Sequence, residues 1–197
     1  MTSPRLLLAV AAALSLCAGA AVPGASAASS GPNVIRGSVQ APSLGPEINI
    51  PGDIVRLARA ELAKGVREIP RGSDNAPEIG LYRAALIPRA RPAAWCAYFV
   101  SWVARRSGAP IGRGGAGIAS AGGIEAWAQR NGRWTHSPRP GDAAVFSGHA
   151  GIVVSVSGSR MTTIDGNWSD RVSLVQRGTG EALGFARIAV GNQPAGR

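Results

Sequence analysis

The chain has 197 residues, a formal net charge of +10, 45% hydrophobic residues and two cysteines. This length allows one domain with a genuine core, and no internal repeat is visible. The arginines that carry the charge are scattered, with no dense basic run and no nucleic-acid motif, so we expect no nucleic-acid partner. The charge instead favours adhesion to anionic polymers, such as those of a bacterial envelope.

Residues 1–27 have the pattern of a secretory signal peptide. Arg5 precedes a short apolar run, and Ala25-Ser26-Ala27 is a small-residue cleavage site. The run is Ala-rich and short for a bilayer, which weighs against an uncleaved anchor. Bulky Leu16 before Cys17 weighs against a lipoprotein signal. We therefore expect a secreted protein that has no membrane span after cleavage.

The remaining chain divides into three parts. Residues 28–51 are rich in Ser, Gly, Pro and Ala and are expected to form a linker or extended arm. Residues 52–190 are assigned to one domain, and residues 191–197 to a tail. Signal cleavage removes Cys17 and leaves Cys96 as the sole cysteine, which excludes a disulfide within the chain. A lone cysteine in an exported protein forms a bridge between chains or is a reactive thiol.

Helices are expected in the first half of the domain. Asp53 is the predicted N-cap of a helix that ends at Gly65. A loop over residues 71–77 precedes a short helix over residues 78–86. Residues 92–108 follow as a helix, with a proline at the start and a glycine just past the end.

Cys96 lies near the first turn of this last helix, on its apolar stripe. The stripe consists of Cys96, Phe99, Val100 and Val103, spaced as one helix face. The positive end of a helix dipole favours a thiolate. The alternative interpretation is a structural cysteine that packs as a small hydrophobe.

Strands are expected in the second half. A glycine-rich segment over residues 111–123 lacks the phosphate-loop pattern and is interpreted as flexible surface, followed by a short helix over residues 124–129. The predicted strands cover residues 143–146, 149–156, 160–164, 171–176 and 185–190. Short spacing and tight turns predict a meandering antiparallel sheet. Helices followed by strands give an α+β fold class.

A cysteine nucleophile needs a base and a residue that orients the base. Of the two histidines, His136 lies in a proline-rich loop, whereas His149 opens the most apolar strand. A hairpin at residues 158–159 would place His149 opposite about Asp165, whose carboxylate could stabilise the imidazolium. Asn167 could orient the ring instead. The structural alternatives are a strand-capping histidine and a simple Asp-Gly-Asn turn.

Other hydrolytic chemistries have little support in the residues. One cysteine and two histidines match no zinc-site spacing, so we expect no metal and no cofactor. A glycosidase needs two convergent carboxylates, and nothing in the sequence brings together Glu68, Glu78 or Glu125.

Four motifs resemble one family. They are Trp95-Cys-Ala-x-Phe-Val-x-Trp102, Gly141-Asp-x-x-Val-Phe146, Gly148-His-x-Gly-Ile-Val153 and Asp165-Gly-Asn167. In this order they resemble the CHAP family of cysteine- and histidine-dependent amidohydrolases and peptidases, related in fold to papain-like and NlpC/P60 enzymes. The resemblance implies a papain-like core and cleavage of amide bonds in peptidoglycan through an acyl-enzyme.

The resemblance also implies roles for single residues. Cys96 would be the nucleophile, His149 the general base, and Asp165 or Asn167 the orienting residue. Trp95 and Trp168 could bind substrate, although each could equally belong to the core. The family often has Glu at the third position, so Asp165 is a departure that leaves the choice open. Some relatives carry an acidic calcium site before the cysteine, and residues 89–95 contain no acid.

The sequence therefore predicts a secreted, wall-associated and monomeric cysteine hydrolase of peptidoglycan. Two bond specificities remain open, that of an N-acetylmuramoyl-L-alanine amidase and that of an endopeptidase. A non-catalytic peptidoglycan-binding module on a degenerate hydrolase fold is the alternative from another functional class. The sequence does not distinguish remodelling of the cell's own wall from attack on other cells.

Overall fold

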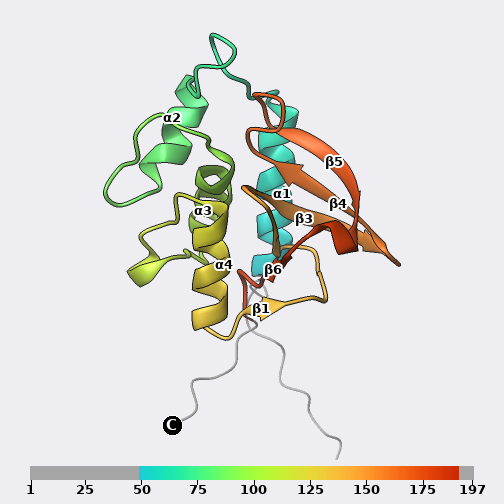
Figure 1. Ribbon diagram of the computed structural model, residues 1–197. Helices are drawn as coiled ribbons and strands as arrows, with labels where there is room; N and C mark the ends of the chain where they lie inside the picture. Colours follow the sequence, from blue (N-terminus) through green and yellow to red (C-terminus); the bar gives the residue numbers. More distant parts are fainter. Residues whose placement is uncertain (1–48, 191–197) are drawn as a thin grey trace, which may run out of the picture. The chain divides into compact units, whose positions relative to one another are not determined.

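A computed structural model describes residues 49–190, which fold into α-helices packed on an antiparallel β-sheet (Figure 1). The helices are α1 (Ile50–Ala63), α2 (Pro77–Ala84), α3 (Cys96–Arg106) and α4 (Ala121–Arg130), with 3-10 turns η1 (Arg113–Gly115) and η2 (Thr179–Glu181). The strands are β1 (Trp134–Thr135), β2 (Ala143–Phe146), β3 (His149–Ser157), β4 (Arg160–Asp165), β5 (Ser173–Gly178) and β6 (Gly184–Ala186). The expected signal peptide, most of the expected linker and the expected tail lie outside the described residues.

The sheet has six strands in the order β1-β6-β2-β3-β4-β5, with every neighbouring pair antiparallel. The α+β fold class is confirmed. The meander is limited to β2 through β5, because β6 returns to pair with β2, and the short strand β1, which the sequence pattern missed, joins β6. No helix among residues 49–190 is long and apolar enough to cross a membrane.

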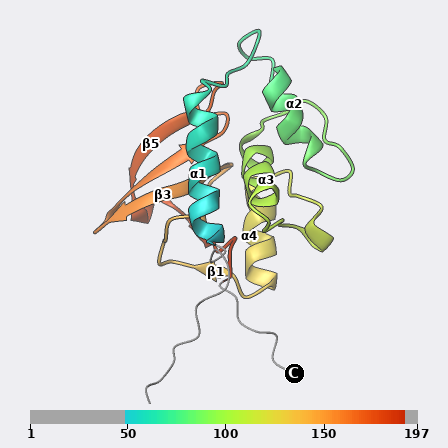
Figure 2. The same cartoon turned by 180° about the vertical axis from the view of Figure 1, so that it is seen from behind.

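The helices cover one face of the sheet, as the two opposite views show (Figures 1 and 2). Alternate strand residues such as Val145, Ile152 and Ile164 face this side and belong to the main core. Residues on the other face, among them Phe146 and Val153, form a smaller apolar cluster. The period-two alternation of strand side chains therefore separates the helix-covered core from the second face.

Helix α1 begins earlier than the sequence predicts. Its N-cap is Asn49, whose side chain accepts a hydrogen bond from Gly52 N at 3.1 Å. Asp53 lies in the first turn and pairs with Arg56, so the expectation that Asp53 caps the helix was wrong. An asparagine is as good a cap as an aspartate, and the upstream cap prevails here. Gly65, with φ of 66°, follows the helix end as expected.

Helix α3 begins later than predicted, at Cys96 rather than near Pro92. Its N-cap residue, Trp95, makes no side-chain capping bond to the helix, and its indole donates instead to Glu68. The contacts of Trp95 with residues distant in sequence thus define the start of the helix, whereas Pro92 predicted an earlier start. The expectation for residues 111–123 also needs correction, because α4 begins at Ala121 and is capped by Ser120.

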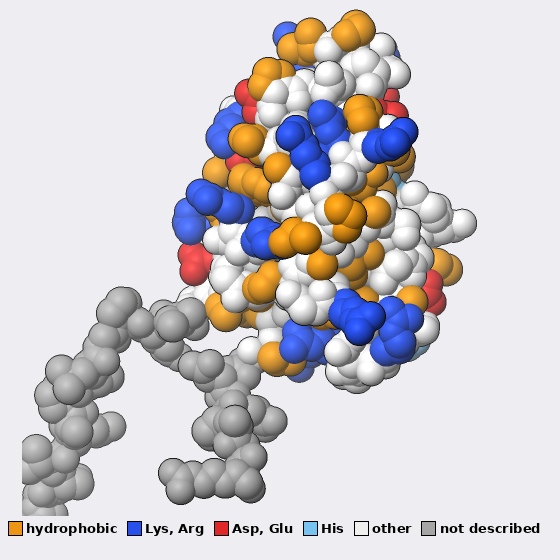
Figure 3. Space-filling model, turned by 90° about the vertical axis from the view of Figure 1, so that its left-hand side faces the viewer, with side chains coloured by type: hydrophobic (Ala, Val, Ile, Leu, Met, Phe, Trp, Pro, Cys, Tyr) orange, Lys and Arg blue, Asp and Glu red, His pale blue; other side chains and the backbone are white. Residues whose placement is uncertain are grey.

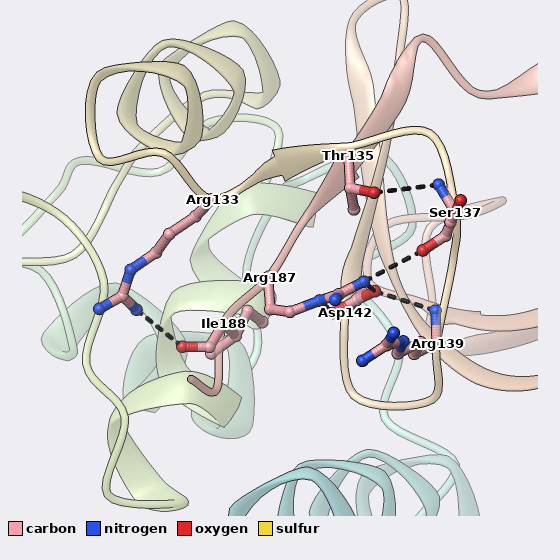
Figure 4. A network of polar contacts seen from close by, with 7 residues as sticks. All are labelled: Arg133, Thr135, Ser137, Arg139, Asp142, Arg187 and Ile188. Atoms are coloured by element: carbon pink, nitrogen blue, oxygen red, sulfur yellow. Dashed lines mark hydrogen bonds and ion pairs between the residues drawn. The ribbon is translucent and has the colours of Figure 1, made fainter. Parts of the chain in front are cut away.

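The Gly-Asp motif before β2 has a structural role, shown in Figure 4. Asp142 is buried, accepts a hydrogen bond from Arg139 N at 2.9 Å and pairs with Arg187 at 3.2 Å. A Cβ on Gly141 would lie 3.0 Å from Pro51 Cα, and the glycine has φ of 91°. The motif therefore fastens the β1–β2 loop to α1 and to the segment after β6, which holds β2 and β3 in place.

Candidate active site

Cys96 is the first residue of α3 and its side chain is free of any disulfide. The predicted stripe of Cys96, Phe99, Val100 and Val103 is buried along its length, with Cys96 retaining 6% exposure. The first backbone N–H groups of a helix lack intrahelical partners and create a positive potential. The thiol therefore lies on a rigid element at a position that favours an anion.

His149 is the first residue of β3, and its Nε2 lies 2.9 Å from Oδ2 of Asp165, the last residue of β4. Burial alone would lower the pKa of His149. Hydrogen bonds to Asp165 and Cys96, together with their negative charges, outweigh burial and raise the pKa to about 9. Because Asp165 occupies Nε2, Nδ1 is the ring nitrogen that remains for the sulfur of Cys96.

The hairpin register differs from the predicted one. Ser157 pairs with Arg160, and an irregularity between Val153 and Ser155 shifts the ladder so that Ile152 pairs with Ile164. His149 is therefore not directly opposite Asp165, and that part of the prediction was wrong. The carboxylate of Asp165, in β4, instead contacts His149 diagonally on the neighbouring strand β3.

Gly151 makes this diagonal contact possible. A Cβ on Gly151 would lie 1.9 Å from Oδ1 of Asp165, a distance that no side chain could tolerate. A second glycine serves the same junction, since a Cβ on Gly166 would lie 2.5 Å from Cβ of Phe99 in α3. The two glycines let the ends of β3 and β4 approach each other and the cysteine helix.

Asn167 has a different set of contacts from Asp165. With its amide oriented to suit both neighbours, it donates to Oε1 of Glu68 at 3.0 Å and accepts from Trp95 N at 3.2 Å. Glu68 is buried and also accepts from the Trp95 indole at 2.9 Å. Asn167 and Glu68 therefore hold the residue that precedes Cys96, while the contact with His149 belongs to Asp165.

Sequence reasoning missed Arg177, which forms a buried ion pair with Asp165. The guanidinium lies between two aromatic rings, 4.3 Å from the centroid of Phe146 and 4.3 Å from that of Trp168. Both rings also flank His149, at centroid distances of 6.2 and 5.4 Å. The sequence feature that could have revealed Arg177 is its place in the strand alternation, on the buried face of β5. The predicted strand ended at residue 176, one residue before this arginine.

The two tryptophans named as possible substrate contacts have different environments. Trp168 is 41% exposed beside the His149 ring and is accessible to a ligand. Trp95 is fully buried, so its ring belongs to the core and the expectation of a substrate contact does not hold. His136 lies in the loop after β1, against Trp134, and takes no part in the cluster.

The assembled group consists of a thiol at a helix start, an imidazole held by a carboxylate, and an arginine that fixes this carboxylate. This arrangement suits covalent catalysis of acyl transfer by a thiolate–imidazolium pair. Within residues 49–190, no cluster of His, Cys, Asp and Glu has the arrangement needed to hold a metal ion.

Comparison with protein families gives one result that agrees with this geometry. Residues 89–167 match the model of the CHAP domain, which confirms the family suggested by the motifs. The matched segment includes the cysteine, the histidine and the carboxylate described above. Searches of curated proteins and of solved structures found no match. The family match supports a hydrolase of the peptidoglycan-cleaving kind.

Proposed function

We propose that this chain, which carries a CHAP domain over residues 89–167, is a secreted cysteine hydrolase that cleaves amide bonds in the peptide part of bacterial peptidoglycan. The observation that carries the proposal is the contact of His149 with Asp165 beside the Cys96 helix, together with the raised pKa of His149. Secretion and wall association rest on the signal pattern and the net charge of +10.

The reaction begins with attack of the Cys96 thiolate on the carbonyl carbon of the scissile amide. Backbone N–H groups at the start of α3 stabilise the oxyanion that forms. The His149 imidazolium then gives its Nδ1 proton to the departing amine, and the C–N bond breaks to leave a thioester on Cys96. Neutral His149 next takes a proton from water as the water oxygen attacks the thioester, and the carboxylic acid product and the Cys96 thiolate are released. The acid then loses its remaining proton to solvent.

Asp165 keeps its charge throughout this cycle. It holds the imidazole through Nε2 and stabilises the imidazolium, as the acid of a hydrolase triad does. No metal takes part in the proposed steps. Trp168 is exposed at the edge of the cluster and offers an aromatic surface for the substrate.

The bond that is cut is tested by mass spectrometry of fragments released from purified peptidoglycan. Release of the stem peptide from muramic acid identifies an amidase, and a cut within the stem or cross-bridge identifies an endopeptidase. A thiol alkylator should abolish release and a chelator should have no effect. The reverse pattern would overturn the cysteine mechanism in favour of a metal.

The binding-module alternative has its own outcome in this experiment. It would hold if wild-type protein and Cys96→Ala both bound walls equally and neither released new amino groups. The proposed enzyme requires release by the wild type and none by Cys96→Ala.

A further inference from the structure

A groove of about 680 Å³ runs along α2. Its lining includes the exposed apolar side chains of Ile69 and Leu81 and the two arginines Arg83 and Arg89. Figure 3 looks onto this side of the molecule, where basic and hydrophobic side chains are intermixed over the upper part and acidic ones lie at the edges. The groove thus combines apolar walls with positive charge.

Gly80 lies inside α2, where glycine is unfavourable relative to alanine. Packing does not require a glycine there. An added Cβ would lie 3.7 Å from Nη2 of Arg83 and 3.8 Å from Nη2 of Arg89, which are ordinary contact distances. What the glycine does provide is an open position within reach of both guanidinium groups.

The charges around this position are unequally matched. Arg83 is buried and donates to the backbone oxygen of Asp74 at 3.0 Å and to Oδ1 of Asn75 at 2.7 Å. Burial, followed by the charge of Glu68, raises the pKa of Asp74, and the charge of Arg83 has a smaller, opposing effect. Within residues 49–190, however, neither Arg83 nor Arg89 forms an ion pair with a carboxylate. The open position therefore carries unbalanced positive charge.

A chain of hydrogen bonds connects the groove to the residue before the nucleophile. The Trp95 indole donates to Glu68, and Asp74 N donates to the other oxygen of Glu68 at 3.0 Å. Arg83 in turn binds the backbone oxygen of Asp74. Helix α2 also packs directly against α3 through Tyr82 and Phe99, so the groove and the nucleophile belong to neighbouring helices.

We propose that Arg83 and Arg89, over the open position at Gly80, form a subsite for a carboxylate of an acidic wall stem peptide. This inference rests on the proposed function and adds a recognition element to it. Ile69 and Leu81 contact the aliphatic parts of the peptide, while the guanidinium groups bind the carboxylate by charge-assisted hydrogen bonds. The subsite discriminates between a free carboxylate and its carboxamide.

The test measures binding to the full-length Cys96→Ser protein, so it does not depend on hydrolysis. The probes are a synthetic alanine–glutamate stem peptide with a free glutamate carboxylate and the same peptide as the carboxamide. We expect about tenfold tighter binding of the free carboxylate, as one charge-assisted contact would give. Titration calorimetry supplies both dissociation constants.

Two variants act on the subsite and two are matched controls. In the Cys96→Ser background, Gly80→Ala fills the open position and Arg89→Gln removes one charge. Each should reduce the preference to less than about threefold. Gly122→Ala, in a helix position with nothing within 4 Å, and Arg130→Gln, an exposed arginine of α4, should leave the preference unchanged. Gly80→Ala should also keep or raise Tm, which separates lost binding from lost folding.

Equal binding of the two peptides to the parent protein would overturn the proposal, as would a preference that survives both Gly80→Ala and Arg89→Gln. Inorganic phosphate is the second probe. If phosphate binds and both variants abolish this binding while the peptide preference is absent, the groove takes wall phosphate polymers and the peptide subsite is rejected. Failure of the proposed function would appear separately, as absence of hydrolysis by the wild type.

Discussion

The carboxylate of Asp165 is shared between two cationic side chains. His149 and Arg177 both contact Oδ2, and the buried Oδ1 has no hydrogen-bond partner among the described residues. One oxygen thus sets the protonation of the histidine while its charge is partly balanced by the arginine. This arrangement yields separate predictions for the two partners of Asp165.

Replacement of Asp165 by Asn should uncouple His149 from its carboxylate. The pKa of His149 should fall from about 9 toward its ordinary value, because the charge and the acceptor that favour the imidazolium are removed. The high-pH limb of kcat/KM should move to lower pH, and kcat should fall by roughly 10²- to 10⁴-fold. A pH–rate profile on solubilised wall fragments measures both. Asn167→Ala serves as the control, and the role of Asp165 would be refuted if both variants kept the wild-type limb.

Arg177 is predicted to be a positioning residue that acts through Asp165. In Arg177→Met the carboxylate charge acts on His149 alone. The pKa of His149 should therefore rise, and the high-pH limb of kcat/KM should move to higher pH. The variant should also lose roughly 3 kcal/mol of stability, because one partner of a buried ion pair is removed. Arg177→Lys keeps the charge and should restore the position of the limb, with less stability than the stacked guanidinium gives. If the high-pH limb of kcat/KM in Arg177→Met stayed at the wild-type pH, the arginine would have a purely structural role.

At the residue scale, the sequence predicted the nucleophile and the histidine through their elements and motifs. It did not decide between Asp165 and Asn167, because the two lie two residues apart at the end of one strand, and a two-residue shift in register would exchange their positions. Arg177 is 12 residues from its partner Asp165. Neither Arg177 nor Glu68 has a local pattern, so their contacts emerge only when separate elements pack together.

At the scale of elements, two local irregularities determine the site. The shift between Val153 and Ser155 alters the β3–β4 register, and the late start of α3 makes Cys96 its first residue. A bulge adds one residue to one strand, and composition gives no reliable sign of it. The strands themselves could be predicted, because turn residues and β-branched runs mark their ends.

Gly151 is the position where this geometry can be tested. In Gly151→Ala the new Cβ would occupy the space of the Asp165 carboxylate, which must then move away from His149. Activity should fall by more than about 100-fold, since displacement of an orienting group has this effect. Gly180→Ala, with no atom within 4 Å, is the matched control and should keep full activity. Hydrolysis rates of the two variants provide the comparison, and equal rates would refute the steric argument.

At the scale of the whole molecule, the site joins the two halves of the chain. The helical half supplies Cys96 and the sheet supplies His149, Asp165 and Arg177. The α+β class could be predicted from hydrophobic periodicity alone. The return of β6 to β2 could not, because it depends on long-range pairing and on the contact of the buried Asp142 with the partly exposed Arg187.

The raised pKa of His149 should be visible in the stability of the molecule. Folding favours the protonated ring, so this contribution is fully present below about pH 6.5 and is lost as pH rises through about 9. The loss should be at most about 3 kcal/mol, as a shift of this size implies. Urea unfolding at about pH 6 and about pH 9 measures it. His149→Gln should lack this part of the pH dependence, and an equal loss in both proteins would assign it to other groups.

The most direct test of the cysteine mechanism is the covalent intermediate. Wild-type protein is mixed with solubilised peptidoglycan, quenched in acid, digested and examined by mass spectrometry. We expect an acyl adduct on the peptide that contains Cys96, with the mass of the product that bears the new carboxyl group less one water, and no adduct in Cys96→Ala. Release of the same wall fragments by Cys96→Ala, with no adduct on the wild-type cysteine, would contradict this mechanism.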